Sequence, residues 1–76
     1  MKKTVAHLQK GESAIITDVA TDNVPLKLLE MGCLPGNKVQ LLHVAPFSDP
    51  MYINVNGSHL AIRKETALHI SIETPS

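Results

Sequence analysis

The dipeptide Asn56-Gly57 constrains the fold of this chain more than any other local feature. Asparagine followed by glycine is the preferred pair for the centre of a two-residue type I′ turn, because both positions need a positive φ. Segments 51–55 and 58–63 alternate apolar and polar residues on either side of this pair, so the sequence predicts a β-hairpin. The turn fixes the register, and the register places one apolar set on a single face: Met51, Ile53, Val55, Leu60 and Ile62.

A short helix is expected earlier in the chain. Val24, Leu28 and Met31 recur at the spacing of one helix face. This spacing predicts a helix over about 23–31, with the side chain of Asp22 as the preferred N-cap. A helix this short is marginal alone in water, so it must pack against the rest of the chain.

The end of this helix is defined by glycine and proline. Gly32 stands where a left-handed residue would end the helix, because glycine has no Cβ to clash. Pro35-Gly36 follows and is typical of a type II turn, in which proline presets the first central φ and glycine accepts the positive second one.

Three more segments have the composition of β-strands: 13–19, 38–45 and 68–73. The first leaves its inward face open, since both Ile15 and Ile16 are apolar. In the second, Leu41 and Leu42 lie on opposite faces, so this strand is either covered on both faces or changes its apolar phase at a bulge; in a chain this small we expect the bent strand. A helical turn is predicted near 64–67, and the last strand is expected to bury Leu68, Ile70 and Ile72.

These elements predict a mainly β chain of 76 residues that forms one domain over 1–76. The expected architecture is a small five-stranded SH3-like barrel, closed or nearly closed, with the short α-helix inserted. Closure would remove exposed strand edges that such a small sheet could not otherwise cover.

Charge and composition argue against several classes of function. Seven basic and seven acidic side chains give a formal net charge of zero, whereas nucleic-acid binders usually carry a basic stripe. Phe47 and Tyr52 are too few rings for a platform that stacks bases. No apolar segment has the length of a membrane span or a signal peptide. We therefore expect a soluble, cytoplasmic protein that docks on another protein.

Three blocks of the sequence together resemble the FeoA family, which contains small cytoplasmic proteins of bacterial ferrous-iron uptake. The blocks are LLEMGCLPG at 28–36, VAPFSDP at 44–50 and LAIRKE at 60–65. The resemblance covers about residues 8 to 73. It implies an SH3-like barrel with an inserted helix. It also implies a partner, the membrane transporter FeoB, whose cytoplasmic part carries a G-protein domain.

Metal ligation is weakly indicated by the residues themselves. The four histidines are scattered, and none has the spacing of a known metal motif. His59 and His69 would face each other only if their strands were neighbours, and Cys33 is the only thiol. We expect ordinary histidines and a small apolar cysteine, with weak binding of Fe²⁺ or another divalent metal left open.

Protein contact is the remaining class of function, because no catalytic triad, phosphate-binding loop or carboxylate pair occurs in the sequence. The candidate contact residues are Lys27, Glu30, Leu34, Phe47 and Arg63. For Phe47 two readings compete, an exposed anchor at a loop tip and a plug that folds back into the barrel, and we expect the plug.

The sequence therefore predicts a non-enzymatic accessory or regulatory protein of ferrous-iron uptake that binds the cytoplasmic part of FeoB. The alternative is a direct metal-binding or metal-sensing domain. No cofactor and no nucleic-acid partner are expected, and the chain is expected to be a monomer or a weak homo-oligomer.

Overall fold

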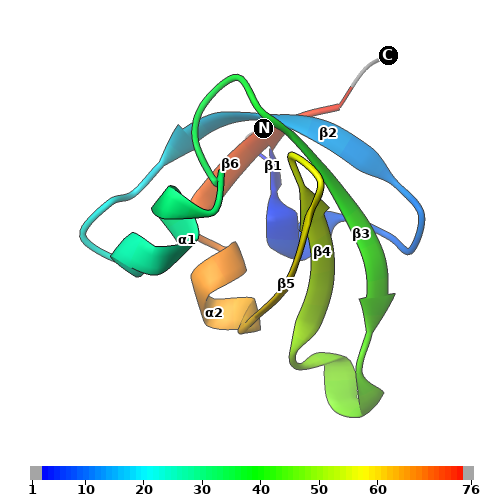
Figure 1. Ribbon diagram of the computed structural model, residues 1–76. Helices are drawn as coiled ribbons and strands as arrows, with labels where there is room; N and C mark the ends of the chain where they lie inside the picture. The colour runs from blue at the N-terminus through cyan, green and yellow to red at the C-terminus, as the bar shows by residue number, and fades with distance from the viewer. Residues whose placement is uncertain (1–2, 75–76) are drawn as a thin grey trace.

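One antiparallel sheet carries the fold (Figure 1). The computed structural model describes residues 3–74. The sheet order is β1-β6-β2-β3-β4-β5, and every neighbouring pair is antiparallel. The strands are β1 (Lys3–Thr4), β2 (Ser13–Val19), β3 (Lys38–Val44), β4 (Met51–Val55), β5 (Ser58–Ile62) and β6 (Ile70–Glu73). The predicted mainly β fold class is confirmed.

The strand count of the predicted barrel was wrong. Within residues 3–74 the sheet has six strands instead of five, because the prediction missed β1. Of the two expected forms, closed or nearly closed, the closed one is excluded for these residues, since the strands at the two ends of the sheet, β1 and β5, do not pair. The reason is the length of β1, which is two residues long before the chain turns into the 3-10 helix η1 (Val5–His7). The predicted domain limits at residues 1 and 76 lie outside the described residues.

The inserted helix is shorter than predicted. Helix α1 spans Leu26–Glu30 instead of 23–31, and Pro25 occupies the N-cap position without a side-chain cap. The prediction of Asp22 as the cap was therefore wrong. Proline disfavours helical geometry in the residue before it, so a helix cannot start ahead of Pro25. Helix α2 spans Lys64–Ala67, which confirms the predicted helical turn.

Gly32 ends α1 in the expected left-handed region, with a φ of 115°. The N–H of Gly32 donates to the C=O of Leu29 at 3.1 Å, and the N–H of Cys33 donates to the C=O of Leu28 at 3.0 Å. This hydrogen-bond pair is the Schellman motif. Gly36 follows with a φ of 95°, as the predicted type II turn requires.

The hairpin β4–β5 has the predicted register. Asn56 and Gly57 have φ values of 51° and 86°, and Val55 pairs with Ser58. Of the five apolar residues predicted on one face of the hairpin, Leu60 is partly buried and the other four are buried: Met51, Ile53, Val55 and Ile62. The chemistry of one dipeptide was therefore enough to fix both strands.

Bulges bend the two longest strands. Pairing of β3 with β4 shifts between Leu41 and His43, which confirms the predicted bulge. Pairing of β2 with β6 shifts between Ile16 and Asp18. The sequence did not show which face of β2 points inward. In the structure Ile16 faces inward and is buried, whereas Ile15 is exposed.

The core lies on the concave side of the sheet. Its fully buried large side chains come from η1, from the region after α1 and from the four strands β2, β3, β4 and β6: Val5, Ile16, Cys33, Val39, Leu41, Ile53, Val55 and Ile70. The expectation that Leu68 would be buried was wrong, because this residue ends α2 and is half exposed. Among the described residues, no helix is both long and apolar enough to cross a bilayer.

The substitution Gly32→Ala should destabilise the protein more than Gly36→Ala. Both changes place a Cβ at positive φ, which costs about 1 kcal/mol. At Gly32 the new Cβ would also lie 3.3 Å from the Cβ of Asn56, whereas at Gly36 nothing lies within 4 Å. We expect a loss of about 2 kcal/mol for Gly32→Ala and about 1 kcal/mol for Gly36→Ala, measured by urea unfolding. Equal losses of stability in the two variants would show that the close approach of Gly32 to Asn56 adds nothing to the cost of the new Cβ.

Candidate functional site

The structure brings together two of the five candidate contact residues. Lys27 on α1 and Arg63 at the end of β5 line one hollow of about 320 Å³. The rest of its lining comes from the start of α1, from β5 and from α2: Pro25, Leu28, Ala61, Ile62 and Thr66. Two cationic side chains therefore flank a mostly apolar groove, which we call the α1–β5 groove.

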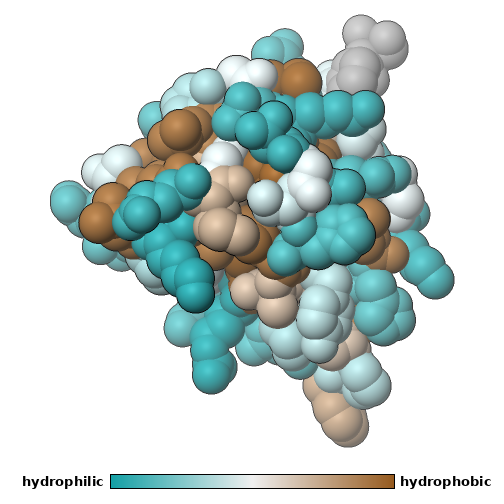
Figure 2. Space-filling model, viewed as in Figure 1, coloured by the Kyte–Doolittle hydropathy of each residue, from teal (hydrophilic) through white to brown (hydrophobic). Residues whose placement is uncertain are grey.

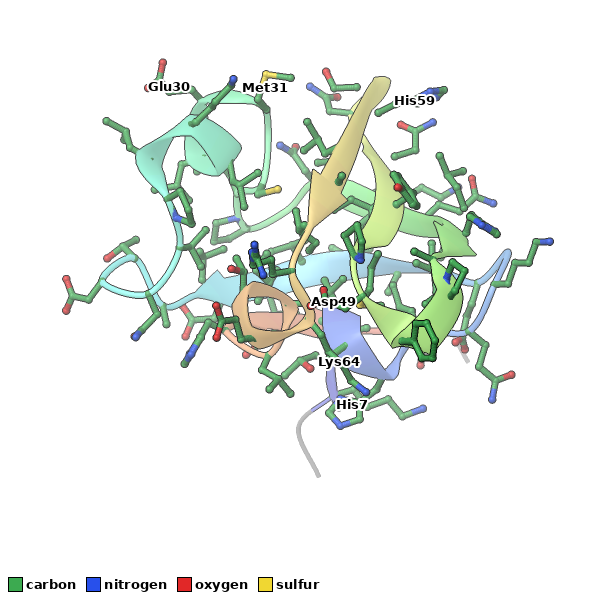
Figure 3. All side chains as sticks on the ribbon, turned by 90° about the horizontal axis from the view of Figure 1, so that it is seen from below. His7, Glu30, Met31, Asp49, His59 and Lys64 are labelled. Atoms are coloured by element: carbon green, nitrogen blue, oxygen red, sulfur yellow. The ribbon has the colours of Figure 1, made fainter. Side chains whose placement is uncertain are left out.

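Arg63 is positioned by the junction of β5 with α2. It is the N-cap residue of α2, and its C=O accepts hydrogen bonds from the N–H groups of Thr66 and Ala67, both at 3.0 Å. The N–H of Lys64 donates to Oδ1 of Asp49 at 3.0 Å, so a carboxylate from a distant loop caps the first turn of α2. Figure 3 shows Asp49 and Lys64 side by side.

Arg63 also lines a second hollow, of about 360 Å³, together with Asp49 and Pro50. The two hollows share Ala61, Ile62 and Arg63, so they lie on either side of the same end of β5. The carboxylate of Asp49 in the second hollow already accepts a hydrogen bond from the backbone of α2.

Glu30 and Leu34 are not part of the lining of the α1–β5 groove. Glu30 points away from the body at the end of α1 (Figure 3), and Leu34 is exposed in the turn that follows. Leu26, which the sequence analysis did not single out, is 68% exposed on α1. Figure 2 shows hydrophobic surface gathered around α1, interrupted by hydrophilic side chains.

Phe47 lies apart from these residues and is not a plug. It is 100% exposed in the 3-10 helix η2 (Pro46–Ser48), at the tip of the loop between β3 and β4. Its φ is 69°, a conformation that costs energy for a bulky residue. The prediction that Phe47 folds back into the core was therefore wrong. The positive φ turns the ring out of the loop, and no feature of the sequence indicates this conformation.

The structure does not bring the candidate metal ligands together. His59 faces Asn54 as the register predicted, but β5 and β6 are separated in the sheet by β2, β3 and β4. His69 precedes β6, so it does not pair across from His59. His7 and His59 lie on opposite sides of the molecule in Figure 3. Within residues 3–74, no three histidine, cysteine or acidic side chains are clustered for a metal ion. Direct metal binding stays a prediction, which anaerobic calorimetry with Fe²⁺ would test.

Cys33 is fully buried among apolar residues. Burial raises the pKa of its thiol above the ordinary value of 9.0, because a thiolate is poorly solvated in the core. The thiolate is the form that attacks electrophiles and binds metals. Cys33 is therefore held in its protonated form and packs as a small apolar side chain.

The structure is that of a small SH3-like β domain with an inserted helix. The α1–β5 groove, which two cationic residues line, lies beside its edge strand β5. A solved FeoA from Stenotrophomonas maltophilia, a complex with zinc described as a prokaryotic SH3 domain protein, has this fold. It is 24% identical, with a TM-score of 0.79 over 93% of this chain and 89% of that one. The chain belongs to the FeoA family, since the family model described as "FeoA domain" matches residues 3–74.

Two further proteins are similar to this chain. The solution structure of the FeoA protein from Chlorobium tepidum is 27% identical, with a TM-score of 0.85 over 97% of this chain and 71% of that one. A fusion protein of Fe²⁺ transport protein A with the Fe²⁺ transporter FeoB, from Porphyromonas gingivalis, is 31% identical over 70 residues. That match covers 91% of this chain, and the chain spans 8% of the length of this curated relative.

Only part of the groove was predictable from the sequence. Lys27 and Arg63 were candidate contact residues, whereas Ala61 and Thr66, which also line the groove, were not. The hairpin register does place Ala61 on the outer face of β5, so a signal existed for this residue. No signal in the sequence showed that α1 and α2 would lie on the same side of β5, as they do in Figure 1.

The substitution Phe47→Gly should raise the stability of the protein. The ring of Phe47 is fully exposed, so little packing is lost, and glycine removes the strain of a φ of 69°. The gain should be about 0.5–1 kcal/mol after the larger entropy of the unfolded glycine chain is subtracted. The matched control, Phe47→Ala, keeps the strain and should change the free energy of unfolding by less than about 0.5 kcal/mol. A loss of stability in both variants would show that the ring packs in solution.

Burial of Cys33 should make the stability of the protein fall at alkaline pH. The pKa of the thiol is raised in the folded state, so above pH 9.0 the unfolded chain loses a proton that the folded chain keeps. This difference lowers the free energy of unfolding as pH rises, by up to about 1.4 kcal/mol per pH unit. Urea unfolding between pH 8 and 10 should give a steeper decline for the wild type than for Cys33→Ala. Parallel declines would show that the thiol ionises freely in the folded protein.

Proposed function

We propose that this chain is a non-enzymatic accessory or regulatory protein of ferrous-iron uptake, and that it acts in the cytoplasm by binding the cytoplasmic part of the FeoB transporter. The observation that carries the proposal is the fused relative, in which an FeoA region and FeoB are parts of one polypeptide. Fusion keeps two domains at a high effective concentration, which favours pairs that work in contact. Where FeoA and FeoB are separate chains, they must form the same contact through their binding affinity alone.

The surface supports a role in binding. Lys27 and Arg63 line a mostly apolar groove, and Leu26 on α1 and Leu34 in the turn after it are exposed. Exposed apolar side chains next to positioned charges are typical of protein-contact surfaces. Phe47 offers a separate exposed ring at a loop tip. The proposal assigns no chemical step to the chain, and its only thiol is buried.

Binding to FeoB is tested with the transporter from the same organism. The purified chain should bind saturably to full-length FeoB in nanodiscs and to the soluble cytoplasmic part of FeoB, with nanodiscs without FeoB as the control. In an NMR titration, the amides that shift should include those of α1 and of Arg63. Absence of saturable binding to both forms of FeoB at high micromolar concentration would contradict the proposal.

A further inference from the structure

The free edge of β5 is the largest unpaired main-chain surface of the sheet. The sheet ends at β1 and β5, and β1 has two residues whereas β5 has five. Long edge strands that lack charges, proline or bulges readily accept another strand. Segment 58–62 contains neither proline nor a charged lysine, arginine or carboxylate, and its pairing with β4 has no bulge.

The register shows which main-chain groups are available on this edge. In a two-residue hairpin the residues that flank the turn exchange both hydrogen bonds, and every second pair along the strands does the same. The bonded pairs therefore involve Ser58, Leu60 and Ile62. The N–H and C=O groups of His59 and Ala61 point away from β4. In the described part of the chain, no other backbone segment bonds to them.

The surroundings of the edge would accept the side chains of an added strand. At the Ala61 end lies the α1–β5 groove, with Lys27 and Arg63 on its rim. A further hollow of about 330 Å³ is lined by three residues of β5, His59, Leu60 and Ala61, together with Leu42, Tyr52 and Ile53. In strand addition, main-chain hydrogen bonds supply affinity and pockets for alternate side chains supply specificity.

The charges define the chemistry of the occupant. The lining of the α1–β5 groove contains two cationic residues and no acidic one, although the whole chain has a formal net charge of zero. This local excess complements a carboxylate. Apolar lining from Pro25, Leu28 and Ile62 complements an aliphatic or aromatic side chain beside it.

We propose that an extended segment of the cytoplasmic part of FeoB, with an acidic and an apolar side chain, adds as a strand to the free edge of β5. Its backbone bonds to His59 and Ala61, its carboxylate lies between Lys27 and Arg63, and its apolar side chain enters the α1–β5 groove. This inference rests on the proposed function and gives it a binding mode.

The variant Ala61→Pro tests whether a strand adds to the edge of β5. Proline at position 61 removes an N–H that faces away from β4, so Ala61→Pro blocks strand addition and keeps the bonds of the hairpin. It should weaken binding to the soluble cytoplasmic part of FeoB by about tenfold or more, as the loss of one or two main-chain hydrogen bonds predicts. The matched control Ala61→Ser keeps this N–H and should bind within about twofold of the wild type.

A second pair of variants tests the groove, and this test remains informative if the variant Ala61→Pro does not fold. The double reversal Lys27→Glu/Arg63→Glu should also weaken binding by about tenfold or more. The control Lys3→Glu/Lys38→Glu makes the same change in net charge outside the groove, and it should bind within about twofold of the wild type. In the wild-type complex, hydrogen exchange should slow for the amides of His59 and Ala61.

The outcomes separate the two proposals. If the wild type does not bind FeoB, both are overturned. If it binds but the amides of His59 and Ala61 stay unprotected, or either the proline variant or the charge reversal retains full affinity in a folded protein, strand addition is overturned and the proposed function stands. If these amides become protected in the chain alone as its concentration rises, the edge is taken by a second copy, and the inference is overturned.

Discussion

The close approach between the end of α1 and the tip of the β4–β5 hairpin is the constraint on which the rest of the surface depends. Gly32 lies so near Asn56 that a Cβ at position 32 would be 3.3 Å from the Cβ of Asn56. The amide of Asn37 also donates to the C=O of Gly32 at 2.8 Å. These contacts hold a five-residue helix, too short to be stable alone, against the sheet. Because α1 is fixed there, Lys27 lies across a groove from Arg63.

A second long-range contact completes the groove. Helix α2 is only four residues long, and its first turn is capped by Asp49, which is 15 residues earlier in the chain. The cap sets where β5 ends and therefore where Arg63 lies. Two short helices that tertiary contacts hold in place thus contribute to the lining of the groove, together with the end of β5. Such a surface is formed only in the folded protein, which suits a domain that recognises a partner by shape and charge.

The open sheet has a functional consequence. A closed barrel would have no free main-chain groups to offer, whereas this sheet leaves β5 unpaired next to the cationic groove. The short length of β1 is the cause. The proposed partner, FeoB, follows from a relative in which FeoA and FeoB regions occur in one polypeptide. The edge and the groove supply a physical account of how the two could associate when they are separate chains.

Features that depend on local chemistry were predictable from the residues alone. Asn56-Gly57 specifies the hairpin and its faces, Gly32 specifies the end of α1, and the apolar phase near Leu41 indicates the bulge in β3. The positions of Phe47, His59 and His69, and the groove that Lys27 and Arg63 share, became known from the folded chain. The physical reason is that φ values, turns and strand faces depend on neighbouring residues, whereas sheet order and the placement of short helices depend on contacts between residues far apart in the chain.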